Sequence, residues 1–131
     1  MPTDFLFDGP DDARVTIMLA HGAGAPMDSA SMTAAAKALS SAGLRVARFE
    51  FAYMAERRTG AGRKPPPRAD KLMPEYRAAI VALGATTPLI IGGKSMGGRI
   101  ASMIKCTPSR PAAKETRPPA IQAWLTVIRL L

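Results

Sequence analysis

Cysteine and histidine are almost missing from this chain, which holds one of each, Cys106 and His21. One cysteine cannot form an intrachain disulfide, so nothing in the sequence indicates an oxidising compartment. Clusters of histidine, cysteine and carboxylate residues with metal-ligand spacing are missing as well. We therefore expect neither a metal ion nor a cofactor.

Long apolar runs are also missing. No stretch reaches the roughly 18 apolar residues that a membrane span needs. Residues 1–10 include acidic side chains and lack a long apolar core, so they do not resemble a secretory signal. These absences predict a soluble, cytoplasmic protein without a membrane partner.

Negative charge and aromatic side chains are scarce. The formal net charge is +8, and only 5% of the residues are aromatic. A basic excess can indicate nucleic-acid binding. Here the positive residues are scattered through loops and a tail, with no zinc-finger spacing and no aromatic-rich RNA-binding signature. We interpret the excess as solvated surface charge and do not expect a nucleic-acid partner.

The chain does contain enough apolar residues for one domain. Its 131 residues are 47% hydrophobic, which allows a core but is short for a complete large α/β enzyme. After Ile104 the composition shifts to prolines and basic residues, before an apolar end at residues 120–131. We therefore divide the chain into a folded unit at residues 1–104 and a divergent, irregular tail at 105–131. The apolar end could form a short helix or strand that covers exposed sheet surface.

Alternating strand-like runs and helical patterns predict an α/β fold. Continuous apolar runs indicate buried strands, and apolar stripes at i, i+3, i+4 and i+7 indicate helices. Strand–helix–strand order implies right-handed crossovers and a mainly parallel sheet flanked by helices. The expected elements are an edge strand at residues 5–7, a strand at 15–20, a helix at 31–41 capped by Asp28 or Ser29, a strand at 44–51, a helix at 70–83, a strand from residue 89 that ends at Gly92 and Gly93, and a further helix after the following turn.

Residues 52–68 are rich in arginine, glycine and proline and are expected to form a loop. Three consecutive prolines at residues 65–67 exclude regular helix there. One functional interpretation is a basic lid that contacts an acidic substrate. We favour the other, a flexible and solvated crossing loop.

The turn at residues 93–97, Gly-Lys-Ser-Met-Gly, matches the pattern G-x-S-x-G. This pattern puts a serine at the tip of a strained strand-to-helix turn, flanked by glycines because the two backbones approach too closely for a Cβ. The helix N-terminus behind the serine favours developing negative charge. We predict Ser95 as a nucleophile, Met96 N–H as an oxyanion donor, and Gly93 and Gly97 as the residues that shape the turn.

A second glycine-containing turn, His21-Gly22-Ala23-Gly24, follows the strand at residues 15–20. It could present the Ala23 N–H to the same sheet edge and so complete an oxyanion hole. His21 is also the one histidine available as a triad base. It lies far upstream of Ser95, whereas the triad order in G-x-S-x-G hydrolases is serine, acid, histidine. We therefore favour a His21 that braces this loop, together with Gly22 and Gly24.

Three segments together resemble the α/β-hydrolase superfamily, and more narrowly its dienelactone-hydrolase-like KANL/Tex branch. They are LAHGAGAPMDS at residues 19–29, RFEFAYMAERR at 48–58 and LIIGGKSMGGRIAS at 89–102. The resemblance covers residues 4–104, which correspond to the N-terminal half of such a domain. It implies a serine hydrolase of a small-molecule ester or related acyl substrate, with Ser95 as nucleophile and Met96 and Ala23 as oxyanion donors.

The sequence departs from this family after Ile104. Family members carry an acid and a histidine late in the chain, but here the one carboxylate after Ser95 is Glu115 and no histidine follows. A serine without a general base is a weak nucleophile. We therefore expect a truncated hydrolase that is weakly active or inactive. The alternative is a non-catalytic interaction protein or fragment that binds a protein partner at an exposed sheet edge.

Overall fold

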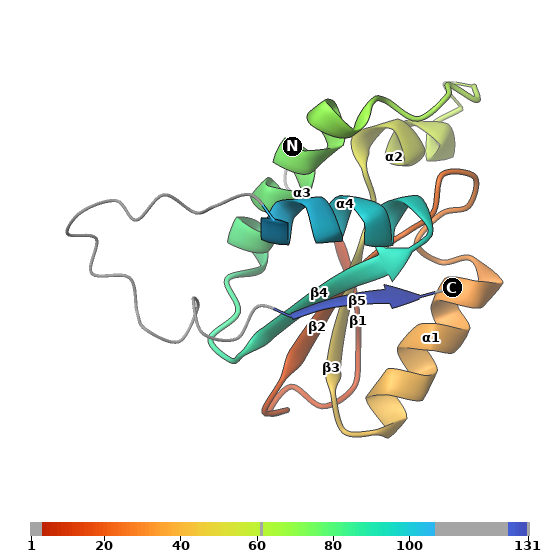
Figure 1. Cartoon of the computed structure of the whole chain (residues 1–131). Coiled ribbons are helices and arrows are strands. Elements are labelled where there is room, and N and C mark those ends of the chain that lie inside the picture. The colour runs from red at the N-terminus through yellow and green to blue at the C-terminus, as the bar shows by residue number, and fades with distance from the viewer. Residues whose placement is uncertain (1–3, 61, 107–125, 131) are drawn as a thin grey trace.

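The computed structural model describes residues 4–60, 62–106 and 126–130. Its centre is a five-stranded sheet in the order β1-β3-β2-β4-β5 (Figure 1). β1 runs antiparallel to β3 at one edge, and the other neighbouring strands are parallel. The α/β fold with a mainly parallel sheet is confirmed. The strands are β1 (Phe5–Asp8), β2 (Thr16–Ala20), β3 (Arg45–Phe49), β4 (Leu89–Lys94) and β5 (Thr126–Leu130).

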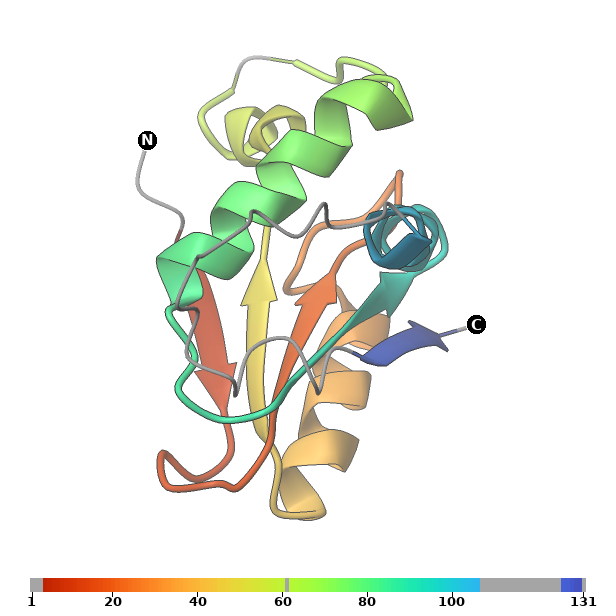
Figure 2. The same ribbon diagram turned by 60° about the vertical axis from the view of Figure 1, so that its left-hand side comes forward.

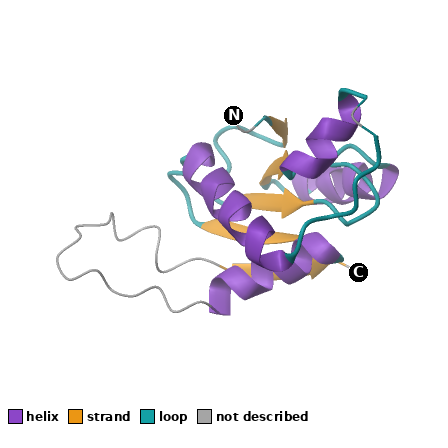
Figure 3. Ribbon diagram, turned by 90° about the horizontal axis from the view of Figure 1, so that it is seen from above, coloured by secondary structure: helices purple, strands orange, loops and turns teal. Residues whose placement is uncertain are grey.

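Helices cover both faces of the sheet, with α1 on one face and α3 and α4 on the other (Figures 2 and 3). α2 follows the carboxyl end of β3. It therefore lies at the same end of the parallel strands as the two predicted glycine turns, at residues 21–24 and 93–97. The bounds of the helices are α1 (Ala30–Ser41), α2 (Ala52–Arg58), α3 (Ala69–Leu83) and α4 (Met96–Cys106).

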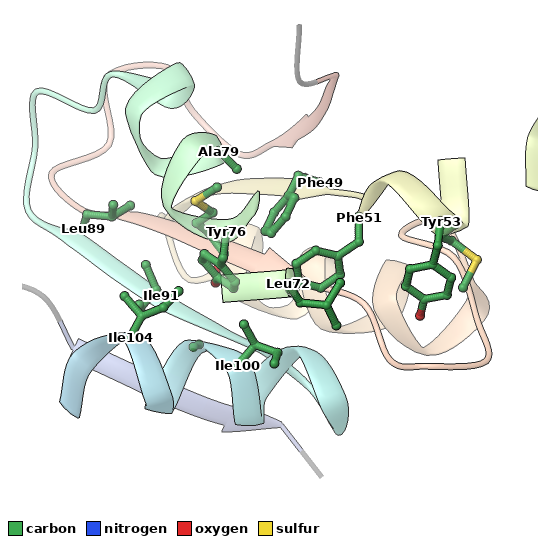
Figure 4. Close-up of a cluster of buried hydrophobic side chains, with 14 residues drawn as sticks. Phe49, Phe51, Tyr53, Leu72, Tyr76, Ala79, Leu89, Ile91, Ile100 and Ile104 are labelled. Carbon is green, nitrogen blue, oxygen red and sulfur yellow. The ribbon is translucent and has the colours of Figure 1, made fainter. Parts of the chain in front are cut away.

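Each face of the sheet has its own core because successive side chains of a strand point to opposite sides. Ile17 and Leu19 of β2 pack with Met32 of α1. Met18 and Ala20 of the same strand point to the other face, where a larger cluster joins the sheet to α2, α3 and α4 (Figure 4). Among the fully buried members of that cluster are Phe49, Phe51, Leu72, Tyr76, Ile91 and Ile100.

The prediction of a loop over residues 52–68 is wrong for its first part, because α2 forms there. Tyr53 and Met54 of α2 are buried in the larger core. Their burial stabilises a helix that the local composition does not favour. Glu75 of α3 accepts a hydrogen bond from the Ala52 N–H at 2.7 Å, so a side chain distant in sequence supplies the missing cap. The three prolines follow α2 and lie outside any helix.

The predicted ends of two strands also need correction. β4 does not end at Gly92 and Gly93 but continues to Lys94, because β2 and β5 pair with it on both sides. β3 ends at Phe49 rather than at residue 51. Of the two residues predicted to cap α1, Ser29 is the cap, because its Oγ accepts the Met32 N–H at 3.4 Å.

The apolar end of the chain contributes β5, which extends the sheet beside β4 (Figure 1). The tail is therefore not irregular at residues 126–130, where the strand of the predicted helix or strand forms, and this strand extends the sheet instead of covering its surface. The remainder of the predicted tail, residues 107–125 and 131, lies outside the described residues. The division of the chain at residue 104 stays a prediction.

Tyr76 ties α3 to the centre of the sheet. Its buried hydroxyl donates to the Gly92 carbonyl at 2.7 Å, accepts the Gly92 N–H at 3.1 Å and lies 3.2 Å from the Met18 carbonyl. Burial raises the pKa of Tyr76, so the hydroxyl stays protonated. We expect Tyr76→Phe to lower the free energy of unfolding in urea by about 1–3 kcal/mol, because buried backbone groups lose their partner.

The matched control is Tyr53→Phe, which removes the hydroxyl of the less deeply buried tyrosine. We expect a smaller loss of stability for Tyr53→Phe than for Tyr76→Phe. Equal unfolding free energies for Tyr76→Phe and the unchanged protein would contradict this account of the sheet centre.

Candidate functional site

Ser95 occupies the turn between the end of β4 and the start of α4. Its φ of 51° lies in the left-handed region, and it is the one non-glycine residue with positive φ in the ranges that the structure describes. Such a conformation costs about 1–3 kcal/mol and persists where the surrounding structure enforces it. Ser95 itself is exposed to solvent. The chain thus holds an exposed serine in a strained strand-to-helix turn, as G-x-S-x-G requires.

The glycines on either side of Ser95 permit this turn through close backbone contacts. A Cβ on Gly93 would lie 2.5 Å from the Ala20 carbonyl oxygen and 2.7 Å from the Gly97 carbonyl carbon. A Cβ on Gly97 would lie 2.5 Å from the carbonyl oxygens of both Ala20 and His21. Any side chain at these two positions would therefore push α4 away from the end of β2.

The second glycine turn lies directly beside the first. A Cβ on Gly22 would be 3.5 Å from the Lys94 carbonyl oxygen and 3.8 Å from the Ser95 Cβ. The structure therefore brings the His21–Gly22 turn next to Ser95, although more than 70 residues separate them in the sequence. A Cβ on Gly24 would meet nothing within 4 Å, so this glycine is not needed for close approach.

Both ring nitrogens of His21 are hydrogen-bonded to the backbone. The Phe51 N–H donates to Nε2 at 3.1 Å, which makes Nε2 the acceptor. Nδ1 therefore carries the proton and donates it to the Gly22 carbonyl at 2.6 Å. The Gly22 carbonyl belongs to the same peptide group as the Ala23 N–H, so this bond fixes the direction of that N–H and polarises it. His21 is fully buried and has no hydrogen bond to Ser95.

Burial lowers the pKa of His21, which keeps the ring neutral at pH 7. The unfolded chain takes up the proton near pH 6.5, whereas the folded chain takes it up only at lower pH. We therefore expect the free energy of unfolding to fall as the pH drops below about 6.5, and to carry no contribution from His21 well above it. Urea unfolding at a series of pH values from about 5 to 8 measures how the free energy of unfolding changes with pH.

The control for this pH dependence is His21→Asn, which removes the titrating ring. The variant should lose the slope between about pH 5 and 6.5, a range in which ordinary carboxyl groups contribute less. An identical slope in the variant and the unchanged protein would contradict a buried, neutral His21.

Tyr53 is a site residue that the sequence analysis missed. Its hydroxyl donates to the Ala23 carbonyl at 2.9 Å and lies 4.0 Å from the Met96 Sδ, so it touches both segments that carry predicted oxyanion donors. Burial raises its pKa, so the hydroxyl remains a donor at neutral pH. Tyr53 belongs to the segment RFEFAYM, which carries part of the family resemblance. The sequence analysis assigned residues 52–68 to a loop, so it could not place this side chain beside Ala23.

The part of the chain that the structure describes brings no acid or base into hydrogen-bonding contact with Ser95. Within the described ranges, no side chain forms a hydrogen bond with the Ser95 hydroxyl, and Glu115 lies outside those ranges. The same described residues contain no group of three or more potential ligands that could hold a metal ion. Nor do they contain a helix with the length and apolar character to cross a membrane.

A mainly parallel sheet, a serine in a strained turn after an inner strand and a neighbouring glycine turn together define an α/β fold of the hydrolase type. A family model described as an alpha/beta hydrolase domain matches residues 13–118. The chain belongs to this family, which indicates a hydrolase-type function and confirms the predicted superfamily. Searches of curated proteins and of solved structures found no match to the chain.

Proposed function

We propose that the protein is a serine hydrolase of esters or related acyl substrates, with Ser95 as the nucleophile. The observation that carries the proposal is the left-handed φ of 51° at an exposed serine that lies beside the Gly22 turn. The N–H groups of Met96 and Ala23 are the proposed oxyanion donors. Assignment to the KANL/Tex-like branch, and a cytoplasmic location, are parts of the same proposal and rest on the sequence alone.

The proposed reaction begins when the Ser95 Oγ attacks the acyl carbon and its proton passes to a general base. The carbonyl electron pair moves onto oxygen, where the two N–H groups stabilise the negative charge. Collapse of this intermediate breaks the bond to the leaving alcohol, which receives the proton from the base. Water then attacks the acyl-serine by the same steps, releases the acid and restores the serine hydroxyl.

The base is the part of this reaction that the described residues do not supply. Their one histidine, His21, is bonded to the backbone through both nitrogens. Because an unactivated serine hydroxyl is a weak nucleophile, we propose that the chain by itself is weakly active. Losing a triad base costs several orders of magnitude in rate, although oxyanion stabilisation and binding leave a residual acceleration.

Chemical rescue tests this proposal, because added imidazole can take the proton that no side chain accepts. We expect imidazole to accelerate acyl transfer from p-nitrophenyl acetate to the protein, after subtraction of the reaction of imidazole alone. Ser95→Ala is the control and should give no acceleration above that background. Equal rates for Ser95→Ala and the unchanged protein, with and without imidazole, would contradict a nucleophilic Ser95.

A second candidate function is a non-catalytic protein that binds a partner through a sheet edge. The specific observation in its favour is that the single histidine, His21, has both ring nitrogens hydrogen-bonded to the backbone. Among the described strands, β5 is paired on one side only, with β4, and a partner strand would pair with its outer edge. Failure of imidazole rescue would favour this candidate over the hydrolase.

A further inference from the structure

Residues 48–58, here called the clamp segment, hold the loop at residues 21–29 that runs from β2 to α1. Arg48 Nη1 donates to the Met27 carbonyl at 3.0 Å, and the Met27 N–H donates to Glu50 Oε2 at 3.2 Å. Arg48 and Glu50 are two residues apart in extended chain, so their side chains lie on the same side. Both backbone polar groups of one loop residue are therefore fixed by the clamp segment.

The Arg58 guanidinium joins Glu50 of the clamp segment to Asp28, the loop residue after Met27. Arg58 donates from Nε and Nη2 to the two carboxylate oxygens of Glu50, at 2.8 and 2.6 Å. It also donates from Nη1 and Nη2 to the carboxylate of Asp28, at 3.2 and 2.6 Å. Forked contacts of this kind fix orientation as well as distance.

The charges of this arrangement depend on one another. The Glu50 side chain is only 5% exposed, so its carboxylate relies on Arg58 and on the Met27 N–H for compensation. The hydrogen bond from Arg58 lowers the pKa of Asp28, so this carboxylate stays ionised at neutral pH. The ion pairs Lys64–Glu56 and Arg68–Asp70 differ from this arrangement in burial, because both side chains of each pair are exposed to solvent.

The clamp segment also binds the first part of the loop. The Phe51 N–H donates to His21, and the Tyr53 hydroxyl donates to the Ala23 carbonyl. The loop is thus attached to the clamp segment at residues 21, 23, 27 and 28, on both sides of the Ala23 N–H. Loss of the attachment at residues 27 and 28 would free one end of the loop while the other end stays bound.

We propose that Glu50 and Arg58 are positioning residues that set the place of the Ala23 N–H relative to Ser95. Among the described residues, neither side chain forms a hydrogen bond with Ser95, so both act through the loop backbone. This inference rests on the proposed function, because the Ala23 N–H has a catalytic role only if an oxyanion forms on an acylated Ser95. A displacement of about 1 Å at such a donor can cost about 100-fold in rate.

Two pairs of matched variants test the inference. Arg58→Gln and Glu50→Gln break the clamp, and Arg68→Gln and Asp70→Asn make matched changes in an exposed ion pair outside it. Two quantities are measured on each folded variant: the rate constant for Ser95 phosphonylation by a fluorophosphonate, and amide hydrogen exchange of peptides that cover residues 22–29. For the clamp variants we expect labelling about tenfold slower or more and loop exchange about tenfold faster. The controls should match the unchanged protein in both.

Rescue by a conservative variant separates positioning from general loss of structure. Arg58→Lys keeps the charge but not the fork, so we expect values between those of Arg58→Gln and the unchanged protein. Unchanged labelling and unchanged loop exchange in Arg58→Gln and Glu50→Gln would overturn the inference. If Ser95 is not labelled in the unchanged protein while loop exchange still responds to the clamp variants, the proposed function fails and the clamp itself stands. Faster exchange across the whole protein, rather than in the loop, would also overturn the inference.

Discussion

Ser95→Ala is expected to abolish covalent labelling of the protein by a fluorophosphonate, as measured by intact mass. The unchanged protein should label slowly, since none of the described side chains acts as a base on the hydroxyl, and added imidazole should speed the reaction. The expectation rests on the turn, because the backbone at Ser95 is held in a left-handed conformation and its side chain is open to solvent. Stabilisation of the developing negative charge by preorganised N–H groups accelerates such reactions about 100- to 1000-fold per donor.

The control for this experiment is Ser31→Ala. Ser31 is an exposed serine whose Oγ accepts a hydrogen bond from Lys94 Nζ at 2.7 Å, so it has a cation beside it but lies in an ordinary helix. Removal of Ser31 should leave labelling unchanged. Labelling that survives in Ser95→Ala would place the adduct on another residue, and labelling that is lost in Ser31→Ala would place it on Ser31; either result would contradict a nucleophilic Ser95.

Gly97→Ala, which adds one methyl group where α4 approaches β2, is expected to lower the free energy of unfolding strongly. The new Cβ would meet the carbonyl oxygens of Ala20 and His21 at 2.5 Å, and both are backbone atoms that a rotamer change cannot move. Alanine would favour the helix by about 1 kcal/mol over glycine. The steric cost outweighs this gain, and we expect the free energy of unfolding to fall by about 3 kcal/mol, at the upper end for overpacked sites.

Gly24→Ala is the matched control, because a Cβ there meets nothing within 4 Å. Urea unfolding of both variants should give a stability near that of the unchanged protein for Gly24→Ala and a large loss for Gly97→Ala. Equal stabilities for the two variants would contradict the close approach of α4 to the end of β2.

The strands and the two glycine turns were predictable because their signals are local. Continuous apolar runs indicate β2 and β4, and the glycines around Ser95 reflect contacts made within one strand-turn-helix unit. The end of β4 was not predictable from its own residues. Gly92 and Gly93 read as a strand end, yet pairing with strands on both sides keeps them in the sheet.

α2 and the parts of the site that depend on it could not be predicted because their contacts are distant in sequence. The Ala52 N–H is capped by Glu75, and the Tyr53 hydroxyl reaches Ala23 across 30 residues. Arg58 also pairs with Asp28 across 30 residues. Composition around α2 indicates a loop, and only tertiary packing reveals a helix whose side chains hold the neighbouring turn.

The most direct test of a nucleophilic Ser95 with an oxyanion hole is a crystal structure of the phosphonylated protein. The account predicts phosphorus bonded to the Ser95 Oγ, with the phosphoryl oxygen about 2.7–3.1 Å from the backbone nitrogens of Met96 and Ala23. An adduct on another residue, or a phosphoryl oxygen that faces solvent away from both nitrogens, would contradict it.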